Sequence, residues 1–282
     1  MITVKDLIEA GVHFGHRSSR WHPNMEPYIH GKHNQIHIID LRETIRGVIR
    51  GAHFLGRLAE AGHEIVFVGT KQQAKELIRE NAERCGMHFV SNRWLGGTLT
   101  NFHTVRSRLK RLEQLEAWEA DGSMTLRKKK EISTLRRERR KIHRNLEGIR
   151  RMSRLPGAMV IVDIRRDHIA LAEARLMGIP VVAVVDTDCN PRDVDVVIPA
   201  NDDAYRSIEI ILRELSDSII AGRDKLAARQ EAEEKKRLED QKASEQKARA
   251  RAEEKKPQEA AAAPAPAADA GAPADAADAS KS

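Results

Sequence analysis

The stretch MVIVDIRRDHIALAEARLMGIPVVAVVDTD, residues 159–188, decides the fold class of this 282-residue chain. It holds two short apolar runs, Met159–Val162 and Val181–Val185, and between them a helical pattern over residues 168–177 that a glycine and a proline close. Near-continuous apolar runs of this length are typical of strands that are covered on both faces of a sheet. The order strand, helix, strand predicts a right-handed βαβ unit with parallel strands.

The same alternation continues on both sides of this unit. Asp40 is expected to cap a helix, with Glu43 at the capping-box position and Gly62 past the helix end. The further elements expected are strands at 36–39, 64–69 and 196–198, and helices at about 41–61, at 72–84 and from about 202. The pattern predicts a doubly wound α/β domain, residues 1–103 and 156–225, into which residues 104–155 are inserted.

The basic charge of the chain is concentrated in that insertion. The sequence has 49 Lys/Arg and 42 Asp/Glu, a formal net charge of +7. Residues 104–155 carry 17 basic and 7 acidic residues, residues 226–282 carry 11 and 12, and the remainder carries 21 and 23. A clustered basic segment is the electrostatic footprint of a nucleic-acid contact. The alternative interpretation is a solvated helix pair whose charge serves no partner.

The insertion is predicted to form an antiparallel helical hairpin with a coiled-coil seam. Apolar residues recur at helical spacing in both halves: Val105, Leu109 and Leu112, then Leu135, Ile142, Leu146 and Ile149. Asp121-Gly122-Ser123 lies between them as the turn. We expect the basic runs 127–130 and 136–141 to lack local acidic partners, and this favours RNA contact over the solvated pair. Arg139 interrupts the seam, so the register stays open.

The cysteines, the hydropathy and the C-terminal composition indicate the cellular compartment and the degree of order of the tail. Cys85 and Cys189 are far apart and form no CxxC, which is typical of a reducing cytosol. The N-terminus has no apolar signal region, and no run is long enough to span a bilayer. Residues 226–256 read as a charged, fraying helix, and residues 257–282, rich in alanine and proline, read as disordered. The chain is expected to be cytoplasmic, with no membrane partner.

Residues 11–41 hold six of the twelve histidines, at positions 13, 16, 22, 30, 33 and 37. The spacings His13-x-x-His16 and His30-x-x-His33 suit a zinc site. However, these histidines alternate with Arg17, Arg20, Trp21 and Lys32, and a basic, aromatic loop also grips phosphates and stacks on bases. We therefore interpret this segment as an RNA contact surface rather than a four-histidine metal site.

Five carboxylates follow the predicted strands: Asp163, Asp186, Asp188, Asp202 and Asp203. In a parallel sheet they meet at one edge, where Mg²⁺ could be held for phosphoryl transfer. An enzyme using Asp163, Asp186 and Asp188 is thus the main rival hypothesis, weakened because no nucleophile or phosphate loop accompanies them.

Residues 91–98 form a second loop of interest: Gly96 and Gly97 permit close approach of the backbone to a partner beside Arg93 and Trp94. That loop is otherwise a tight turn with Trp94 in the core.

Four motifs in order carry a resemblance to a known family. GVHFGHRSSRWHPNMEPYI, FVGTKQQA, RWLGGTLTNF and DTDCNPRDVDVVIPANDDA closely resemble the bacterial small-subunit ribosomal protein S-two family, from about residue 3 to residue 223. The resemblance implies a flavodoxin-like sheet with a coiled-coil hairpin. It also implies a non-enzymatic, ribosome-bound protein that contacts small-subunit rRNA and neighbouring ribosomal proteins and helps to dock the mRNA-binding protein S-one. Neither a small-molecule substrate nor a required cofactor is expected.

The candidate site residues follow from the surfaces and the resemblance together. A single zinc or magnesium ion is a further hypothesis, because the positions that match the family's metal ligands are His16, Asp186 and Asp202. The RNA-contact candidates are Arg17, Arg20, Trp21, Lys32, Arg93, Trp94, Arg106, Arg108, Lys110, Lys128, Lys129, Lys130, Arg136 and Arg137. An adaptor that uses the hairpin on a protein partner remains a third alternative.

Overall fold

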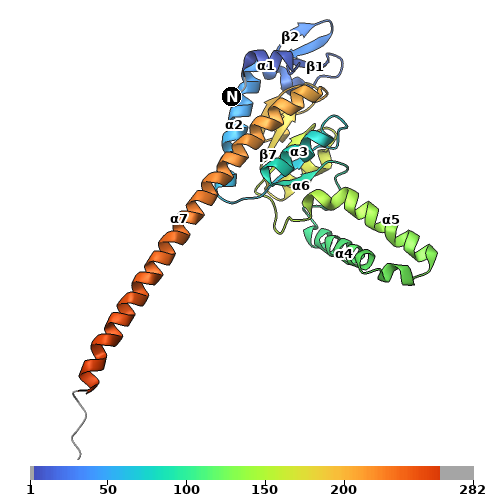
Figure 1. Cartoon of the computed structure of the whole chain (residues 1–282). Helices are drawn as coiled ribbons and strands as arrows, with labels where there is room; N and C mark the ends of the chain where they lie inside the picture. The colour runs from blue at the N-terminus through green and yellow to red at the C-terminus, as the bar shows by residue number, and fades with distance from the viewer. Residues whose placement is uncertain (1–2, 261–282) are drawn as a thin grey trace, which may run out of the picture. The chain divides into compact units, whose positions relative to one another are not determined.

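The computed structural model describes residues 3–260 of the chain (Figure 1). The chain divides into two compact units, Met1–Ala228 and Arg229–Ser282. Helix α7 runs from Tyr205 to Ala260, so the described part of the second unit is helical. The prediction of disorder for residues 257–282 is wrong for residues 257–260, which belong to α7, and its remainder, from residue 261 on, lies outside the described residues.

Unit 1 contains a five-stranded parallel sheet in the order β5-β4-β6-β7-β8. Its strands are β4 (Ile65–Val68), β5 (His88–Val90), β6 (Ala158–Val162), β7 (Val181–Val185) and β8 (Val196–Pro199). This order is the flavodoxin-like one, and the chain changes direction across the sheet between β4 and β6. The predicted parallel α/β architecture is confirmed. Strand β5 was not predicted, because three residues form no recognisable apolar run.

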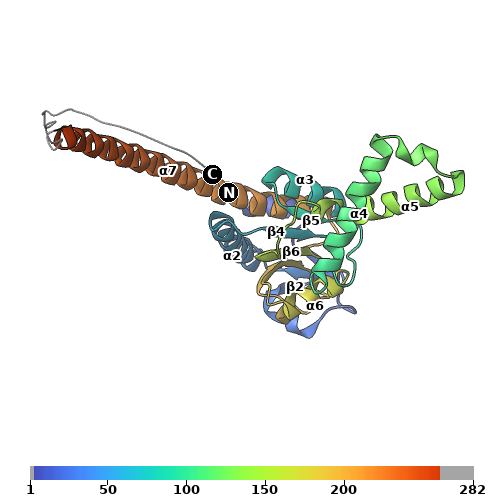
Figure 2. The same ribbon diagram turned by 90° about the horizontal axis from the view of Figure 1, so that it is seen from below.

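Side chains that alternate along β4 face two different cores, as a strand covered on both sides requires. Ile65 and Phe67 pack with α2 (Leu41–Glu60), α3 (Lys75–Cys85) and the start of α7. Val66 and Val68 pack with α6 (His168–Leu176), with the loop after β5 and with the helical insertion. Figures 1 and 2 show the strands enclosed between these helices. The two faces explain why the strands read as continuous apolar runs.

The N-terminal segment forms a second sheet, and this corrects the sequence analysis. Strands β1 (Phe14–Arg17), β2 (Ile29–His33) and β3 (Ile36–Ile39) pair antiparallel in the order β1-β3-β2. Residues 36–39 were predicted as a strand of the parallel framework, and the region before them as a loop. Every second residue of β3 is buried. A strand covered on one face is typical of an antiparallel sheet. The short helices α1 (Val4–Glu9) and η1 (Pro23–Tyr28) flank β1.

The insertion forms two helices that pack against each other, α4 (Phe102–Ala120) and α5 (Lys129–Leu146). The chain reverses at Gly122, whose φ of 70° is the left-handed conformation that glycine adopts readily. The short helices η2 (Ser123–Leu126) and η3 (Glu147–Ile149) complete the insertion, and η4 (Pro191–Asp193) lies after β7. The predicted seam residues are buried: Val105, Leu109 and Leu112 on α4, Leu135, Ile142 and Leu146 on α5, and Ile149 on η3. Leu115 of α4, which was not predicted, is buried as well. Coiled-coil packing along this seam stays a prediction.

Candidate functional site

The carboxyl ends of the parallel strands gather a cluster of charged side chains. Lys71 follows β4, Asp163 follows β6, Asp186 follows β7, and Asp202 and Asp203 follow β8. Since these strands are parallel, their ends meet at one edge of the sheet, beside the point where the strand order reverses. The strand pattern predicts that the carboxylates meet at this edge, but it gives no indication of Lys71.

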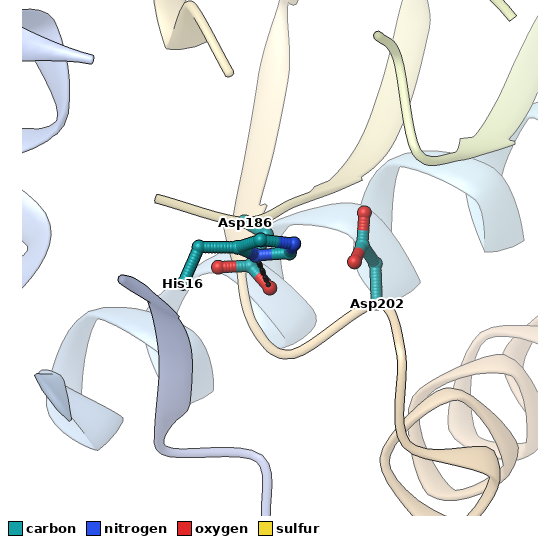
Figure 3. Close-up of side chains that lie close together, drawn as sticks. All are labelled: His16, Asp186 and Asp202. Carbon is teal, nitrogen blue, oxygen red and sulfur yellow. Dashed lines mark ion pairs between the residues drawn. The ribbon is translucent and has the colours of Figure 1, made fainter. Parts of the chain in front are cut away.

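Strand β1 brings His16 from the N-terminal sheet into this cluster (Figure 3). His16 Nδ1 lies 2.9 Å from Asp186 Oδ2, and His16 Nε2 lies 3.5 Å from Asp203 Oδ2. The backbone N–H of His16 also donates to Thr187 Oγ1 at 2.9 Å. Gly15 permits this approach, because a Cβ there would lie 2.6 Å from the Thr187 methyl carbon. His16 therefore joins the two sheets of unit 1.

The ammonium group of Lys71 neutralises the other carboxylates. Its Nζ lies 2.7 Å from Asp202 Oδ1, 2.6 Å from Asp203 Oδ1 and 3.7 Å from Asp163 Oδ2. Lys71 and Asp202 are both buried, at 9% and 1% exposure. A buried carboxylate needs such a partner, because an isolated charge in the interior is strongly unfavourable.

The ionisation of the cluster follows from these contacts. The hydrogen bond to Asp186 raises the pKa of His16 to about 9 although burial acts in the opposite direction. Burial raises the pKa of Asp202 to about 7, with the charges of Asp186 and Asp163 acting in the same sense and Lys71 opposing them. Burial alone would lower the pKa of Lys71, but its carboxylate partners outweigh burial and raise it. His16 and Lys71 are thus the cations of this site at neutral pH.

The donor set of His16, Asp186 and Asp202 fits a divalent cation in ligand type. One imidazole nitrogen and two carboxylate oxygens lie within 4.8 Å of one another. Imidazole with carboxylates suits zinc. Each donor nevertheless already has a partner within the protein, since His16 is bound to Asp186 and Asp202 to Lys71. A metal ion would have to displace the proton of His16 and loosen the Lys71 contact.

The candidate RNA-contact residues belong to three segments of unit 1: the N-terminal sheet with the turn after β1, the loop after β5, and the hairpin. Figure 1 shows the N-terminal sheet and the hairpin as separate parts of the fold. Most of the candidates are exposed: Arg17, Arg20, Lys32, Arg93, Arg108, Lys110, Lys128, Lys129, Lys130, Arg136 and Arg137. Trp21 is partly exposed and packs on His37, with ring centroids 5.2 Å apart. These side chains are available to a partner.

Two of the candidates have structural contacts instead. Trp94 is only 5% exposed, and its Nε1 donates to Glu173 Oε1 at 3.1 Å. Its ring offers no face to a base, so the prediction that Trp94 contacts RNA is not kept. Arg106 is partly buried, and its Nη1 donates to the Met152 carbonyl at 2.9 Å, which fixes the base of the hairpin.

The expectation that the hairpin's basic runs lack local acidic partners is wrong for some of their members. Arg127 pairs with Glu131, while Arg136 and Arg139 share Glu119 of the opposite helix. Ion pairs between the two helices cannot be predicted from local sequence, because they join residues about one helix length apart in the chain. For the rest, no ion pair is present among the side chains that the structure describes: Lys128, Lys129, Lys130, Arg137, Arg140 and Lys141.

The fold and these surfaces define a class: a flavodoxin-like α/β protein with a basic helical insertion, whose strand-end cluster is neutralised by its own side chains. A family model described as ribosomal protein S2 matches residues 7–222. The small ribosomal subunit protein uS2 of Rhodopirellula baltica is 56% identical over 220 residues, which cover 78% of this chain and 85% of the relative. The chain belongs to the ribosomal protein S2 family.

The membership excludes the enzymatic interpretation. Proteins of this family are structural components of the small ribosomal subunit with a role in translation, and they are not enzymes. The hypothesis of a Mg²⁺-dependent phosphoryl-transfer enzyme is therefore wrong. Among the described residues, no helix has both the length and the apolar character that crossing a membrane requires.

Proposed function

We propose that the chain binds the RNA of the small ribosomal subunit, with the unpaired cations of the hairpin as its main source of electrostatic attraction. The observation that carries this proposal is the set of six exposed lysines and arginines on α5 and just before it that have no carboxylate partner among the described side chains. When lysine and arginine side chains neutralise phosphates, the counterions condensed on the RNA are released, and this release favours binding.

The N-terminal sheet and the loop after β5 supply individual side-chain contacts at fixed positions rather than a net positive charge. Arg17, Arg20, Lys32 and Arg93 are exposed, and Trp21, which follows Arg20 in the sequence, is partly exposed. Outside residues 104–155 the chain has slightly more acidic than basic residues, so long-range attraction there is weak. Arginine forks and a stacking ring favour discrimination among RNA structures.

The partner proteins and the compartment follow from the motif resemblance. We propose that the protein acts in the cytoplasm within the small subunit and helps to dock the mRNA-binding protein S-one beside other ribosomal proteins. A divalent metal on His16, Asp186 and Asp202 is an optional addition, because the protein's own cations already neutralise these carboxylates.

The salt dependence of RNA binding tests the main proposal. Replacing Lys128, Lys129, Lys130 and Arg137 by glutamine removes four unpaired hairpin cations. The slope of log affinity against log salt for purified small-subunit rRNA should become shallower by about 3, at roughly 0.7–0.9 per lost phosphate contact. The matched control removes four exposed cations of α7, Lys225, Lys235, Lys236 and Arg237, and should leave the slope unchanged.

An equal effect of the two variants would show that only net charge matters and would remove the hairpin's assigned role. An unchanged slope in the hairpin variant, together with lost binding of a ribosomal protein, would instead favour the adaptor interpretation.

A further inference from the structure

Glu173 accepts hydrogen bonds from one continuous loop. Its Oε1 accepts from Trp94 Nε1 at 3.1 Å and from the Gly97 N–H at 2.7 Å. Its Oε2 accepts from the Leu99 N–H at 2.8 Å, from the Thr100 N–H at 3.2 Å and from Thr100 Oγ1 at 3.4 Å. The loop, residues 91–101, is thus wrapped around a single carboxylate.

This carboxylate is held without a cationic partner. Glu173 is 6% exposed, and no ion pair joins it to a lysine, arginine or histidine among the described side chains. Successive backbone N–H groups that converge on one anion form a concave anion-binding arrangement of the kind that holds phosphates in other proteins. Burial raises the pKa of Glu173, but the backbone donors outweigh burial and lower it, so the side chain is ionised at neutral pH.

The loop connects β5 to α4, and it is fixed at two further points. Asn92 Nδ2 donates to the Arg144 carbonyl at 2.9 Å, which ties the start of the loop to the end of α5. Gly97 has a φ of 89°, the conformation that turns its N–H toward Glu173. Between these points Arg93 is exposed, directly before the buried Trp94. The geometry therefore sets where the Arg93 side chain leaves the surface.

We propose that Glu173 is the positioning residue for RNA recognition by this loop: its buried carboxylate holds residues 94–100 so that Arg93 is presented to RNA in a fixed place. This inference rests on the proposed RNA-binding function and adds a residue that touches no RNA itself. A loop ordered before binding avoids the entropic penalty of being ordered on the RNA, so loosening it lowers affinity without removing any contact.

The substitution Glu173→Gln tests the role with little change of shape. One acceptor oxygen becomes an NH₂ group that faces N–H donors, so about half of the hydrogen bonds are lost and the negative charge is removed. Affinity for purified small-subunit rRNA, measured well below the melting temperature with tRNA as competitor, should fall about tenfold, because hydrogen bonds to a charged group are strong. Glu80→Gln, an exposed glutamate on α3, is the matched control and should bind RNA as the parent protein does.

A double-mutant cycle with Arg93→Ala separates positioning from general loss of stability. If Glu173 acts through Arg93, Glu173→Gln should weaken binding much less when Arg93 is already alanine. An equal loss in both backgrounds, or no loss of affinity in Glu173→Gln, would overturn the inference. If Glu173→Gln does not fold, Trp94→Phe, which removes one donor from Glu173, takes its place in the same cycle.

The hairpin variants distinguish failure of this inference from failure of the proposed function. An unaffected Arg93→Ala protein combined with a weakened hairpin variant would reject the role of the loop and keep RNA binding. Unaffected RNA affinity in both would reject the proposed function itself.

Discussion

The two adjacent glycines of the loop after β5 differ in what the protein requires of them. Gly97 has a φ of 89°, and a Cβ there would lie 3.4 Å from the Asn101 Cβ. Gly96 has no positive φ, and a Cβ at that position would meet nothing within 4 Å. The sequence pattern predicts a close backbone approach at both positions, whereas the structure supplies an internal reason for glycine at Gly97 only.

Valine at each position should therefore have a different effect. Gly97→Val should lower stability by about 1–3 kcal/mol, since a β-branched residue is strained in the left-handed region. Gly96→Val should keep the parent melting temperature but incorporate poorly into small subunits, if RNA lies against the loop. Thermal melting and incorporation are measured separately. Normal incorporation of Gly96→Val would show that nothing approaches the loop closely at Gly96.

For individual residues, the sequence predicts which types of side chain form the site, but it does not predict their contact partners. The strand-end rule placed Asp186 and Asp202 at one edge of the sheet, and the family motifs added His16. Lys71 was missed because its partners lie about 90 to 130 positions away in the chain, which no local pattern reports. Glu173 was also missed, although one signal was available: it lies on the buried face of α6, between Ala170 and Ala174.

At the scale of elements, the N-terminal sheet is joined to the parallel sheet by the His16–Asp186 ion pair. Most helices and strands of the framework are predictable from the sequence, because burial on two faces leaves a clear apolar signal. Strands β1 and β2 are not, since their sequences FGHR and IHGKH have few apolar residues and are ordered by pairing with β3. Strands that depend on tertiary pairing carry a weak local signal.

The ion pair makes a pH dependence that can be measured. The pKa of His16 is raised from 6.5 to about 9 on folding. Its stabilisation is therefore fully present below pH 6.5 and is lost as the pH rises through 9. In EDTA, the free energy of unfolding should fall by about 2 kcal/mol between pH 7 and pH 9 relative to His16→Asn. Asp202, with a pKa of about 7, also loses its proton as the pH rises from 7 to 9 in both proteins, so the difference between them is the quantity that reports His16.

Taking the difference between the two proteins cancels the contributions of other titrating groups. One of these is Cys85, because burial raises the pKa of its thiol to about 11. A flat difference between pH 7 and pH 9 would mean that His16 is neutral in the folded protein. A zinc-induced rise in the melting temperature of the parent protein, absent in His16→Asn, would place a metal ion at this site.

At the scale of the whole molecule, both the basic excess and the buried cores belong to the first unit. The two buried cores, with every strand of the parallel sheet, lie in Met1–Ala228. The basic excess lies in the insertion, and residues 226–282 carry 11 basic and 12 acidic residues. The exposed turns of α7 from residue 227 to residue 238 bury no apolar side chain. The described side chains of residues 229–238 are therefore solvated.

The stability of a chain shortened at its C-terminus depends on whether Leu226 is kept. Leu226 is partly buried, and its Cδ2 lies 3.5 Å from where a Cβ would stand on Gly62, at the turn that ends α2. A chain that ends after Ala228 keeps this contact, whereas a chain that ends after Lys225 loses it. The first truncation should melt within about 1 °C of the full chain, and the second should melt a few degrees lower, since burying part of a leucine contributes about 1 kcal/mol. Both should enter small subunits, because the hairpin and the N-terminal sheet are unchanged. Failure of the Ala228 truncation to be incorporated, with a normal melting temperature, would show that residues 229–282 contact a partner in the ribosome and are more than a solvated extension.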